Sequence, residues 1–372
     1  MGAEATRERK LDNLVPFVGA FQKLWQTRGS LAIQVLIRRR SDMKVLVIGA
    51  GRMGVIRVED LVADKRVTQV LIANRNAEKG KELADRFGAS VLPWSEIETA
   101  EVDAVVVAVG TSAHQEVLEM VAPKSLAILC EKPIAPTIAG TLEAINLVEK
   151  NGSSLQIGFQ RRFDEPIKAM QQKVASGEVG TLYALNMTAH DKTPSEKAFM
   201  AGSGGIFRDM HVHDFDLVRW ITGSEVESVY ATKAVRYQMD YKEFDDADVT
   251  AINIKTVNGV QVVITGTRHG ALGHDVRMEV FGSKDALSAG LNTRTPLHDL
   301  ESQLELNINP YGGFVDRFRD AFRNETGSFV SFALGEIENP CPPDSALESL
   351  RIAVACEKSI ETGSAIKVAD IN

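Results

Sequence analysis

The strongest constraint on the fold is the segment MKVLVIGAGRMG, residues 43–54. Its first half is a continuous apolar and β-branched run, which is typical of a strand buried on both faces of a parallel sheet. Gly49, Gly51 and Gly54 follow in the spacing G-x-G-x-x-G, and a helical pattern comes directly after them. The first glycine permits a tight turn, the second lets the backbone approach a pyrophosphate, and the third lets the helix pack on the strand. The segment therefore predicts a dinucleotide-binding turn with a helix N-terminus directed at the anion.

Strand-like and helical segments alternate after this turn. Apolar runs recur as VTQVLIAN, AVVVAVG, LAILCE and LQIGF, and helical stretches such as AEKGKELADRFG and TIAGTLEAINLVEKNG separate them. This alternation predicts a doubly wound parallel sheet, that is, an α/β Rossmann domain over residues 43–160. A glycine-rich turn that serves only the geometry of the chain is the alternative interpretation of the motif.

The pattern changes after about residue 160. Alternating segments at 225–236, 249–270 and 276–290 carry hairpin signals, among them Asn258 and Gly259 between two strands. We expect a C-terminal α+β domain over residues 161–340 with a largely antiparallel sheet. A helix at about 343–363 is expected to pack back on one domain, with Cys356 in its apolar stripe.

Asn74 and Arg75, which end the second predicted strand, bear on the choice of dinucleotide. A ribose 2′-hydroxyl is usually held by Asp or Glu about 20 residues after the glycines, whereas a 2′-phosphate needs that acid absent and an arginine near. The pair therefore favours NADP over NAD as the cofactor. A solvated loop arginine is the alternative interpretation of Arg75.

Charge and cysteine content narrow the class of function. The chain has 42 lysines and arginines against 50 aspartates and glutamates, a formal net charge of −8, which disfavours nucleic-acid binding. The 3 cysteines are too few and too scattered for a disulfide framework, and no Cys/His cluster has metal-ligand spacing, so a reducing cytoplasm and no metal are expected. No apolar run approaches the roughly 20 residues that span a bilayer, so membrane insertion is not expected.

Residues 1–42 differ from the rest of the chain. They carry several arginines and a patchy amphipathic stretch, while their acidic residues argue against an organellar transit peptide and no secretory cleavage site is present. Our hypothesis is that Met43 is the biological start and that residues 1–42 are a poorly ordered extension or a translation artefact. N-terminal mass analysis of natively expressed protein would test it.

Two distant segments carry candidate catalytic side chains. In DMHVHDFDLVRWITG, Asp209 and His213 stand four residues apart and would share one face of a helix, where a carboxylate raises and orients the basicity of an imidazole. A local hydrogen bond near a helix start is the alternative for this pair. Lys132, in CEKPIA, follows a buried strand at the sheet edge where ligands bind, and its ammonium could stabilise a developing alkoxide. A surface lysine is the alternative there.

Taken together, these segments resemble the GFO/IDH/MocA oxidoreductases, the family of glucose-fructose oxidoreductase and inositol dehydrogenase. The resemblance covers nearly all of residues 43–368 and rests on the glycine turn, EKP, GFQRRFD, SGGIFRDMHVHDFD and SALESLRIAVACEKSIETG. GGIFRDM followed by HDFD is similar to the myo-inositol 2-dehydrogenase branch. The resemblance implies a Rossmann domain, a second domain whose open sheet joins the subunits of a homodimer or homotetramer, and a C-terminal helix returning to the first domain.

The resemblance also assigns roles to single residues. It implies catalytic roles for Lys132, Asp209 and His213, and substrate contacts for Arg161, the first arginine of GFQRRFD, and for Asp216, the last acid of HDFD.

Two other histidines are weaker candidates. His190 ends a strand beside Asp191 and is a candidate substrate contact, although loop chemistry explains the pair nearly as well. His211 matches no catalytic position of the family, and we expect an exposed or packing histidine.

The expected cofactor-binding residues come from the glycine turn, the end of the second strand and the EKP segment: Gly49, Gly51, Arg52, Met53, Gly54, Asn74, Arg75, Glu131 and Lys132. The sequence departs from the usual inositol dehydrogenase pattern at Asn74 and Arg75, where an acid commonly stands. This departure puts the use of NAD in doubt.

The function predicted on this basis is NAD(P)-dependent oxidation of a secondary alcohol of a cyclic polyol or sugar. His213 would accept the hydroxyl proton, Lys132 would stabilise the oxygen, and Asp209 would orient the histidine and a substrate hydroxyl. Alternatives are another sugar oxidoreductase of the same family, an imine or biliverdin-type reductase, and a non-catalytic dinucleotide sensor. An intact set of three candidate catalytic residues argues against the sensor.

Overall fold

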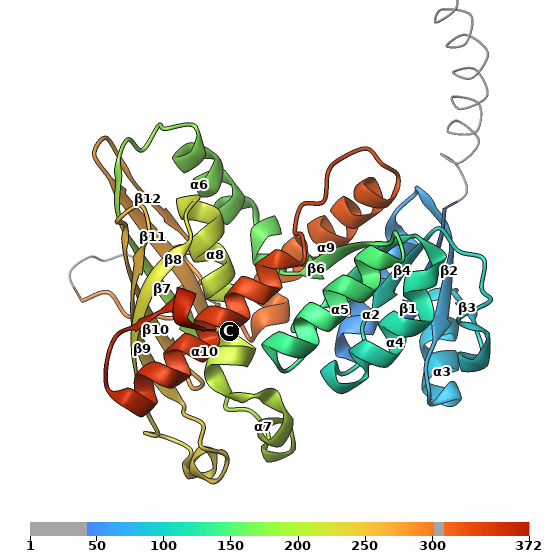
Figure 1. The fold of residues 1–372 in the computed structure, drawn as a ribbon, viewed down its shortest axis with the longest axis horizontal. Helices are drawn as coiled ribbons and strands as arrows, with labels where there is room; N and C mark the ends of the chain where they lie inside the picture. Colours follow the sequence, from blue (N-terminus) through green and yellow to red (C-terminus); the bar gives the residue numbers. More distant parts are fainter. Residues whose placement is uncertain (1–42, 301–308, 372) are drawn as a thin grey trace, which may run out of the picture.

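The structure is a computed structural model that describes residues 43–300 and 309–371 (Figure 1). The predicted extension at residues 1–42, together with the hypothesis about its origin, lies outside the described residues. Two sheets organise the described chain, and the segments between them share one hydrophobic core.

The first sheet has six parallel strands in the order β3-β2-β1-β4-β5-β6, which confirms the predicted doubly wound sheet. Its strands are β1 (Met43–Ile48), β2 (Val67–Ala73), β3 (Ser90–Val91), β4 (Ala104–Val107), β5 (Ala127–Glu131) and β6 (Ser154–Gly158). Its helices are α2 (Arg52–Ala63), α3 (Ala77–Phe87), α4 (His114–Val121) and α5 (Ile138–Lys150). The central strands β1, β4 and β5 are almost entirely buried because helices cover both faces, so they need the continuous apolar runs seen in the sequence.

The second sheet has seven strands in the order β12-β11-β7-β10-β9-β8-β13 and is mostly antiparallel, as predicted; only β7 and β10 pair in parallel. Its strands are β7 (Leu182–His190), β8 (Val226–Ala234), β9 (Val249–Thr256), β10 (Gln261–Thr267), β11 (Asp275–Gly282), β12 (Ala286–Ala289) and β13 (Ile366–Lys367). The remaining helices are α6 (Glu165–Ala175), α7 (Lys197–Ser203), α8 (Val212–Thr222), α9 (Phe314–Ala333) and α10 (Asp344–Thr362).

One face of the second sheet is covered by α6, α8 and α10, whereas no helix of the described chain covers the other (Figure 1). Strand β9 shows the consequence: its residues alternate between buried and exposed along their whole length. The predicted hairpin turn at Asn258 and Gly259 joins β9 to β10, with Gly259 at a φ of 91°. Such a positive φ is the reason that glycine suits this turn.

The C-terminal helix packs elsewhere than the sequence suggested, and the helix before it takes the expected place. Helix α10 lies mainly on α8 and on strand β8 of the second sheet and contacts the first layer less extensively, at α5, so it does not chiefly return to the first domain. Helix α9, which the sequence analysis did not single out, instead packs on α2 of the first layer through Phe329 and Val330. Cys356 is fully buried in α10, in agreement with the expectation.

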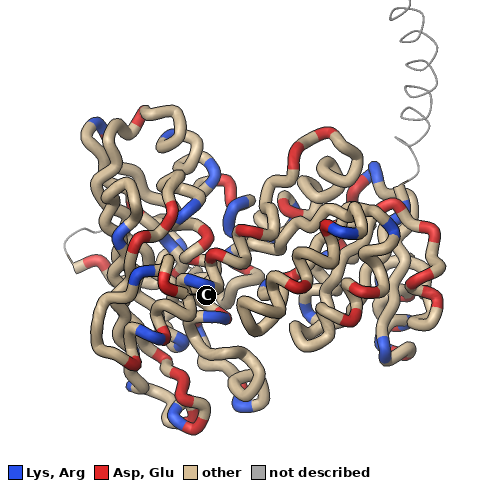
Figure 2. Tube along the Cα trace, viewed as in Figure 1, with Lys and Arg blue, Asp and Glu red and all other residues tan. Residues whose placement is uncertain are grey.

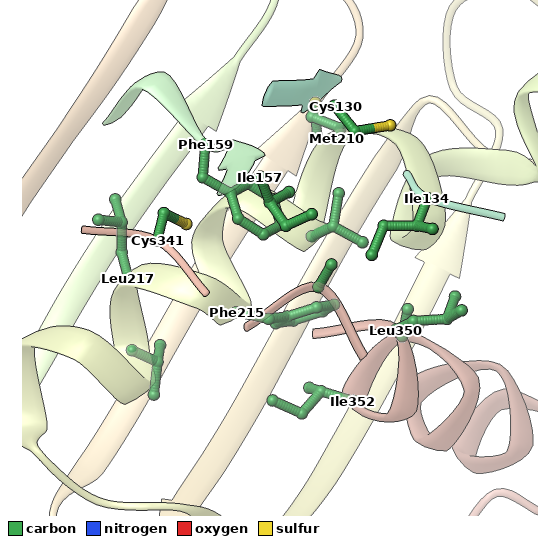
Figure 3. Close-up of a cluster of buried hydrophobic side chains, with 14 of the residues drawn as sticks. Cys130, Ile134, Ile157, Phe159, Met210, Phe215, Leu217, Cys341, Leu350 and Ile352 are labelled. Carbon is green, nitrogen blue, oxygen red and sulfur yellow. The ribbon is translucent and has the colours of Figure 1, made fainter. Parts of the chain in front are cut away.

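The two sheet layers meet in a single apolar cluster (Figure 3). Ile157 and Phe159 come from the end of β6, Phe215 comes from α8, and Leu350 and Ile352 come from α10. Burying side chains of this size contributes about 1.5–3 kcal/mol each. The cluster therefore fixes α8 against the carboxyl ends of the parallel strands.

Charged residues of both signs are mixed along both parts of the described chain (Figure 2). Many of them form ion pairs, including fully buried ones such as Arg57 with Glu325. Among the described residues, no helix is both long enough and apolar enough to cross a bilayer.

Candidate active site

A cavity of about 820 Å³ lies where the carboxyl ends of the parallel strands face the second sheet. This is the position at which open α/β sheets bind their ligands, and the volume is that of a cofactor or small-molecule site. The first layer contributes residues that follow β1, β4, β5 and β6, among them Gly51, Val109 and Lys132. The second part of the chain contributes Asp209 and His213, together with segments before α7 and α9.

The glycine turn has the shape that a bound phosphate requires. Gly49 has a φ of 116°, and a Cβ on it would lie 2.4 Å from the carbonyl oxygen of Ala108. A Cβ on Gly54 would lie 2.0 Å from the carbonyl oxygen of Gly49, so only glycine lets α2 begin so close to β1. Gly51 lines the cavity, and a Cβ there would point into open space, the route by which a pyrophosphate approaches the backbone.

Arg52 and Met53, in the first turn of α2, also line the cavity. The guanidinium of Arg52 stacks over the Phe314 ring, 4.7 Å from its centroid, which joins α2 to the start of α9. The residues present at this turn fit a dinucleotide.

Asn74 and Arg75 lie at the carboxyl end of β2 but do not line the cavity. The Asn74 side-chain oxygen accepts a hydrogen bond from the backbone N–H of Ala50 at 3.0 Å, so Asn74 supports the glycine turn directly. Arg75 is exposed, forms an ion pair with Glu116, and stacks on the Trp94 ring at 5.2 Å from its centroid. This arginine is therefore accessible beside the turn and already oriented by two neighbours.

Lys132 follows β5 and enters the cavity beside Glu131, as predicted from its place after a buried strand. Its Nζ donates to the backbone carbonyl of Asp209 at 2.5 Å and to the Asp209 carboxylate at 3.2 Å. The peptide bond from Lys132 to Pro133 is cis. Glu131 is buried and accepts a hydrogen bond of 2.8 Å from Nε of Arg57.

The segment that carries Asp209 is a π-helical turn, Phe207–His211, which precedes α8. From the sequence, Asp209 and His213 were expected to pair on one face of a regular α-helix, and this expectation is wrong in its contacts. The wider turn changes the side-chain spacing, and the carboxylate of Asp209 is instead held by Lys132 and, at 3.0 Å, by Nη1 of Arg268. Burial raises the pKa of the Asp209 carboxyl, but the charges of Lys132 and Arg268 outweigh burial and hold it below its ordinary value.

His213 lies in the first turn of α8, lines the cavity and packs edge-on against Phe159. Its Nδ1 is buried and has no hydrogen-bond partner among the described residues, which leaves Nε2 as the nitrogen for a ligand. Burial, followed by the charges of Lys132 and Arg161, holds the pKa of His213 well below its ordinary value. The imidazole is therefore neutral near pH 7 without help from a carboxylate, in contrast to the expected effect of Asp209, and it is a weaker base than a solvated imidazole.

Arg161 is buried, lines the cavity and forms an ion pair with Asp214. The same carboxylate accepts a hydrogen bond of 2.8 Å from Nδ1 of His211, whose Nε2 lies 2.7 Å from the hydroxyl of Thr250. His211 is therefore a fully buried packing residue and is not exposed.

Two predicted substrate contacts do not line the cavity. Both carboxylate oxygens of Asp216 are occupied by Arg162, at 2.8 Å and 2.6 Å, so this acid is a buried ion-pair partner. His190 lies at the end of β7, and its Nε2 is 3.5 Å from the hydroxyl of Thr265 on the neighbouring strand. The structure therefore does not bring Asp216 and His190 to this cavity, and their predicted substrate contacts are not carried into the proposed function.

Arg268 and His274 are among the cavity residues that were not predicted from the sequence. Arg268 follows β10 directly, and His274 lies 3.3 Å from the carboxylate of Asp191 across the cavity wall. Their only local signal is the segment RHGALGHD after a strand, which is equally typical of a solvated loop. Contacts between distant segments, absent from any local pattern, are what bring them to the cavity.

Comparison with known proteins identifies the family of this chain. Residues 43–159 match the oxidoreductase family with an NAD-binding Rossmann fold, GFO/IDH/MocA, and residues 167–288 match the GFO/IDH/MocA C-terminal domain. The chain is 30% identical over 336 residues to the myo-inositol 2-dehydrogenase of Thermotoga maritima, covering 88% of this chain and 99% of that one. It is also 30% identical to the inositol 2-dehydrogenase of Rhizobium meliloti, covering 87% and 98%.

A solved structure agrees with this placement. The probable dehydrogenase from Thermotoga maritima superposes with a TM-score of 0.83 at 28% identity, covering 89% of this chain and 100% of that one. With its NAD-binding Rossmann layer, its second sheet and its matching length, the chain belongs to the GFO/IDH/MocA family of oxidoreductases.

Proposed function

We propose that this oxidoreductase removes a hydride from a secondary alcohol of a cyclic polyol, as an inositol 2-dehydrogenase does. The observation that carries the proposal is the meeting of Lys132, Asp209 and His213 in one cavity beside the glycine turn. The names of the relatives from Thermotoga maritima and Rhizobium meliloti support the same substrate class.

Each of these side chains has a separate task in the reaction. A nicotinamide dinucleotide held at Gly51 and the N-terminus of α2 would supply the hydride acceptor. His213, neutral because its pKa is depressed, accepts the proton of the reacting hydroxyl at Nε2. Lys132 donates a hydrogen bond to the same oxygen and stabilises the negative charge that develops as the proton leaves.

Asp209 acts on Lys132 and a substrate hydroxyl. Because its carboxylate and its backbone carbonyl both accept hydrogen bonds from Lys132, it fixes the direction of the ammonium group. Arg161, buried at the cavity wall, is the residue that we assign to the binding of further hydroxyls.

We further infer a preference for NADP over NAD. The end of β2 carries Asn74 where an acid would bind a ribose 2′-hydroxyl, and Arg75 stands next to it, exposed and free to exchange Glu116 for a 2′-phosphate. Arg75→Ala should lower kcat/KM for NADP by 10-fold or more and leave that for NAD within 2-fold. Asn74→Asp should reverse the preference, and a wild type that strongly prefers NAD would contradict the inference.

We also propose a cytoplasmic homodimer or homotetramer that uses the uncovered face of the second sheet. Tyr230, Val263 and Phe281 are exposed on β8, β10 and β11, while the three cysteines are free and buried, which suits a reducing compartment. Sedimentation analysis of Val263→Lys against the wild type tests the interface, since a charge on this face should dissociate the subunits.

The experiment that tests the main proposal is a spectrophotometric screen at the absorbance of the reduced nicotinamide. Inositols, other cyclic polyols and pyranose sugars are offered with NADP and with NAD, and the product of each positive reaction is identified. Oxidation of an inositol supports the proposal. Turnover of a sugar alone would favour another sugar oxidoreductase of the family, and no turnover with any alcohol would contradict a dehydrogenase.

A further inference from the structure

Arg268 is the most completely buried cation that lines the cavity. It follows β10 directly, and the residue is only 1% exposed. A buried guanidinium loses most of its hydration, so it is retained only where carboxylates or other acceptors compensate. The identity of those acceptors therefore indicates its task.

The strongest contact of Arg268 is with the candidate catalytic acid. Nη1 donates to the Asp209 carboxylate at 3.0 Å and reaches the hydroxyl of Ser195 at 3.4 Å. Nη2 lies 3.7 Å from the carboxylate of Asp246, and the group stacks over the Tyr241 ring at 5.8 Å from its centroid. The guanidinium is therefore anchored to Asp209 through Nη1, while its Nε and Nη2 are buried without a hydrogen-bond partner among the described residues.

The two oxygens of Asp209 are divided between two cations. Oδ1 accepts from Lys132 and Oδ2 accepts from Arg268, so the carboxylate bridges them. The contact with Asp246 is weaker, because its Oδ2 lies 3.7 Å from Nη2, beyond hydrogen-bond distance, while its Oδ1 accepts from the backbone N–H groups of Ile206 and Ala247, both at 2.8 Å. Arg268 is thus the group that fixes the second oxygen of Asp209.

We propose that Arg268 is a positioning residue that acts through Asp209: it holds the carboxylate in the orientation that directs Lys132 at the reacting oxygen. This inference rests on the proposed dehydrogenase function only for the reaction that it serves. An arginine suits this position because its planar fork can contact Asp209 and the opposite wall at once, which a lysine cannot do.

The bridge also sets the charge beside the substrate. A Lys132–Asp209 pair alone is neutral, and Arg268 adds a second cation on the same carboxylate, which Asp246, 3.7 Å from Nη2, offsets only in part. This second cation lies beside the ammonium group that faces the developing alkoxide. Loss of Arg268 should therefore lower kcat more than it raises KM for the polyol.

A double-mutant cycle tests this proposal with Arg268→Gln, Asp209→Asn and the double variant. If Arg268 acts through Asp209, Arg268→Gln lowers kcat 10-fold or more in the wild type and less than 2-fold in the Asp209→Asn background. Arg268→Lys keeps the charge and should restore part of the loss. Additive effects in the cycle, or wild-type kcat in Arg268→Gln, would overturn the proposal.

A second readout of the same cycle needs no turnover. The rate at which acetic anhydride modifies Lys132, measured by peptide mass spectrometry, should rise several-fold in Asp209→Asn, which loses the carboxylate that holds the ammonium group, and should change several-fold in Arg268→Gln but not when that substitution is added to Asp209→Asn. An unchanged rate would overturn the proposal even if every polyol proved inert. Inertness with the expected labelling would contradict the proposed function alone.

A matched control comes from the same part of the chain. Arg219 lies in the last turn of α8, has a side chain 12% exposed, and pairs with Glu225 at 2.7 Å, but it does not line the cavity. Arg219→Gln should leave both kcat and Lys132 labelling within 2-fold of the wild type. A loss equal to that of Arg268→Gln would show that the loss of another arginine ion pair of this domain has the same effect, and would overturn the specific role.

Discussion

Glu325, on α9, should make the stability of the protein depend on pH. Arg57, fully buried on α2, donates to Glu131 at 2.8 Å and to Glu325 at 2.5 Å, so two buried carboxylates share one guanidinium. Burial, opposed by Arg57 and assisted by the charge of Glu131, raises the pKa of Glu325 from 4.5 to about 7. At about 1.4 kcal/mol per pH unit, the shift corresponds to about 3 kcal/mol of stability.

The sign follows from proton binding. Between pH 4.5 and 7 the folded state retains the Glu325 proton that the unfolded chain has lost, so this stabilisation is fully present below pH 4.5 and is lost as the pH rises through about 7. Glu325→Gln keeps the shape but cannot ionise. It should match the wild type at acid pH and exceed it by about 3 kcal/mol at pH 8.

Urea unfolding at pH 5, 6, 7 and 8, followed by far-ultraviolet circular dichroism, measures both proteins. The difference between them isolates Glu325 from the other groups that titrate in this range. Glu101→Gln, at an exposed site, is the control and should follow the wild type at every pH. Parallel curves for the wild type and Glu325→Gln would refute the reasoning.

Three further outcomes are expected. His213→Ala should lower kcat about 100-fold or more with little change in the cofactor Kd, and unchanged turnover would remove His213 from the mechanism. Because the pKa of His213 is depressed, kcat/KM of the wild type should stay level from pH 8 down to its ordinary pKa of 6.5, and a fall within that interval would contradict a neutral His213. Gly266→Ala places a Cβ 2.4 Å from Nε2 of His211 and should lower stability by about 1–3 kcal/mol, whereas Gly327→Ala in α9, with its nearest contact at 3.6 Å, should be neutral or stabilising in the same thermal melt.

The features of the fold that local patterns encode were predictable. The continuous apolar run of β1, the spacing of Gly49, Gly51 and Gly54, and the β9–β10 turn at Gly259 each specify their structure within a few residues. The parallel pairing of β7 with β10 and the placement of α9 on α2 depend on contacts between segments far apart in the chain. The hydrophobic periodicity of one segment does not show which distant segment it will pack against.

The site was predictable only to the extent that strand ends indicate position. Lys132 follows a buried strand of a parallel sheet, so its place at the cavity edge follows from the fold. Of the two adjacent arginines, Arg161 faces the cavity and Arg162 pairs with Asp216. The short 3₁₀ turn Gln160–Phe163 sets these two directions, and no sequence pattern predicted that turn. The π-helical turn before α8 also has no sequence pattern that predicts it, although it determines what Asp209 contacts.

In the segment from Asp209 to Asp216, one ionisable side chain is left free for proton transfer. Each of the three acids in this segment forms an ion pair with a cation from another segment. Asp209 pairs with Lys132 and Arg268, Asp214 pairs with Arg161, and Asp216 pairs with Arg162. His211 is held at both ring nitrogens. A group that must gain and lose a proton in each turnover cannot also be fixed in such a pair, because protonation would then break the packing that holds the two layers together. His213, neutral and without a charged partner, is the one ionisable side chain of this run that meets the requirement.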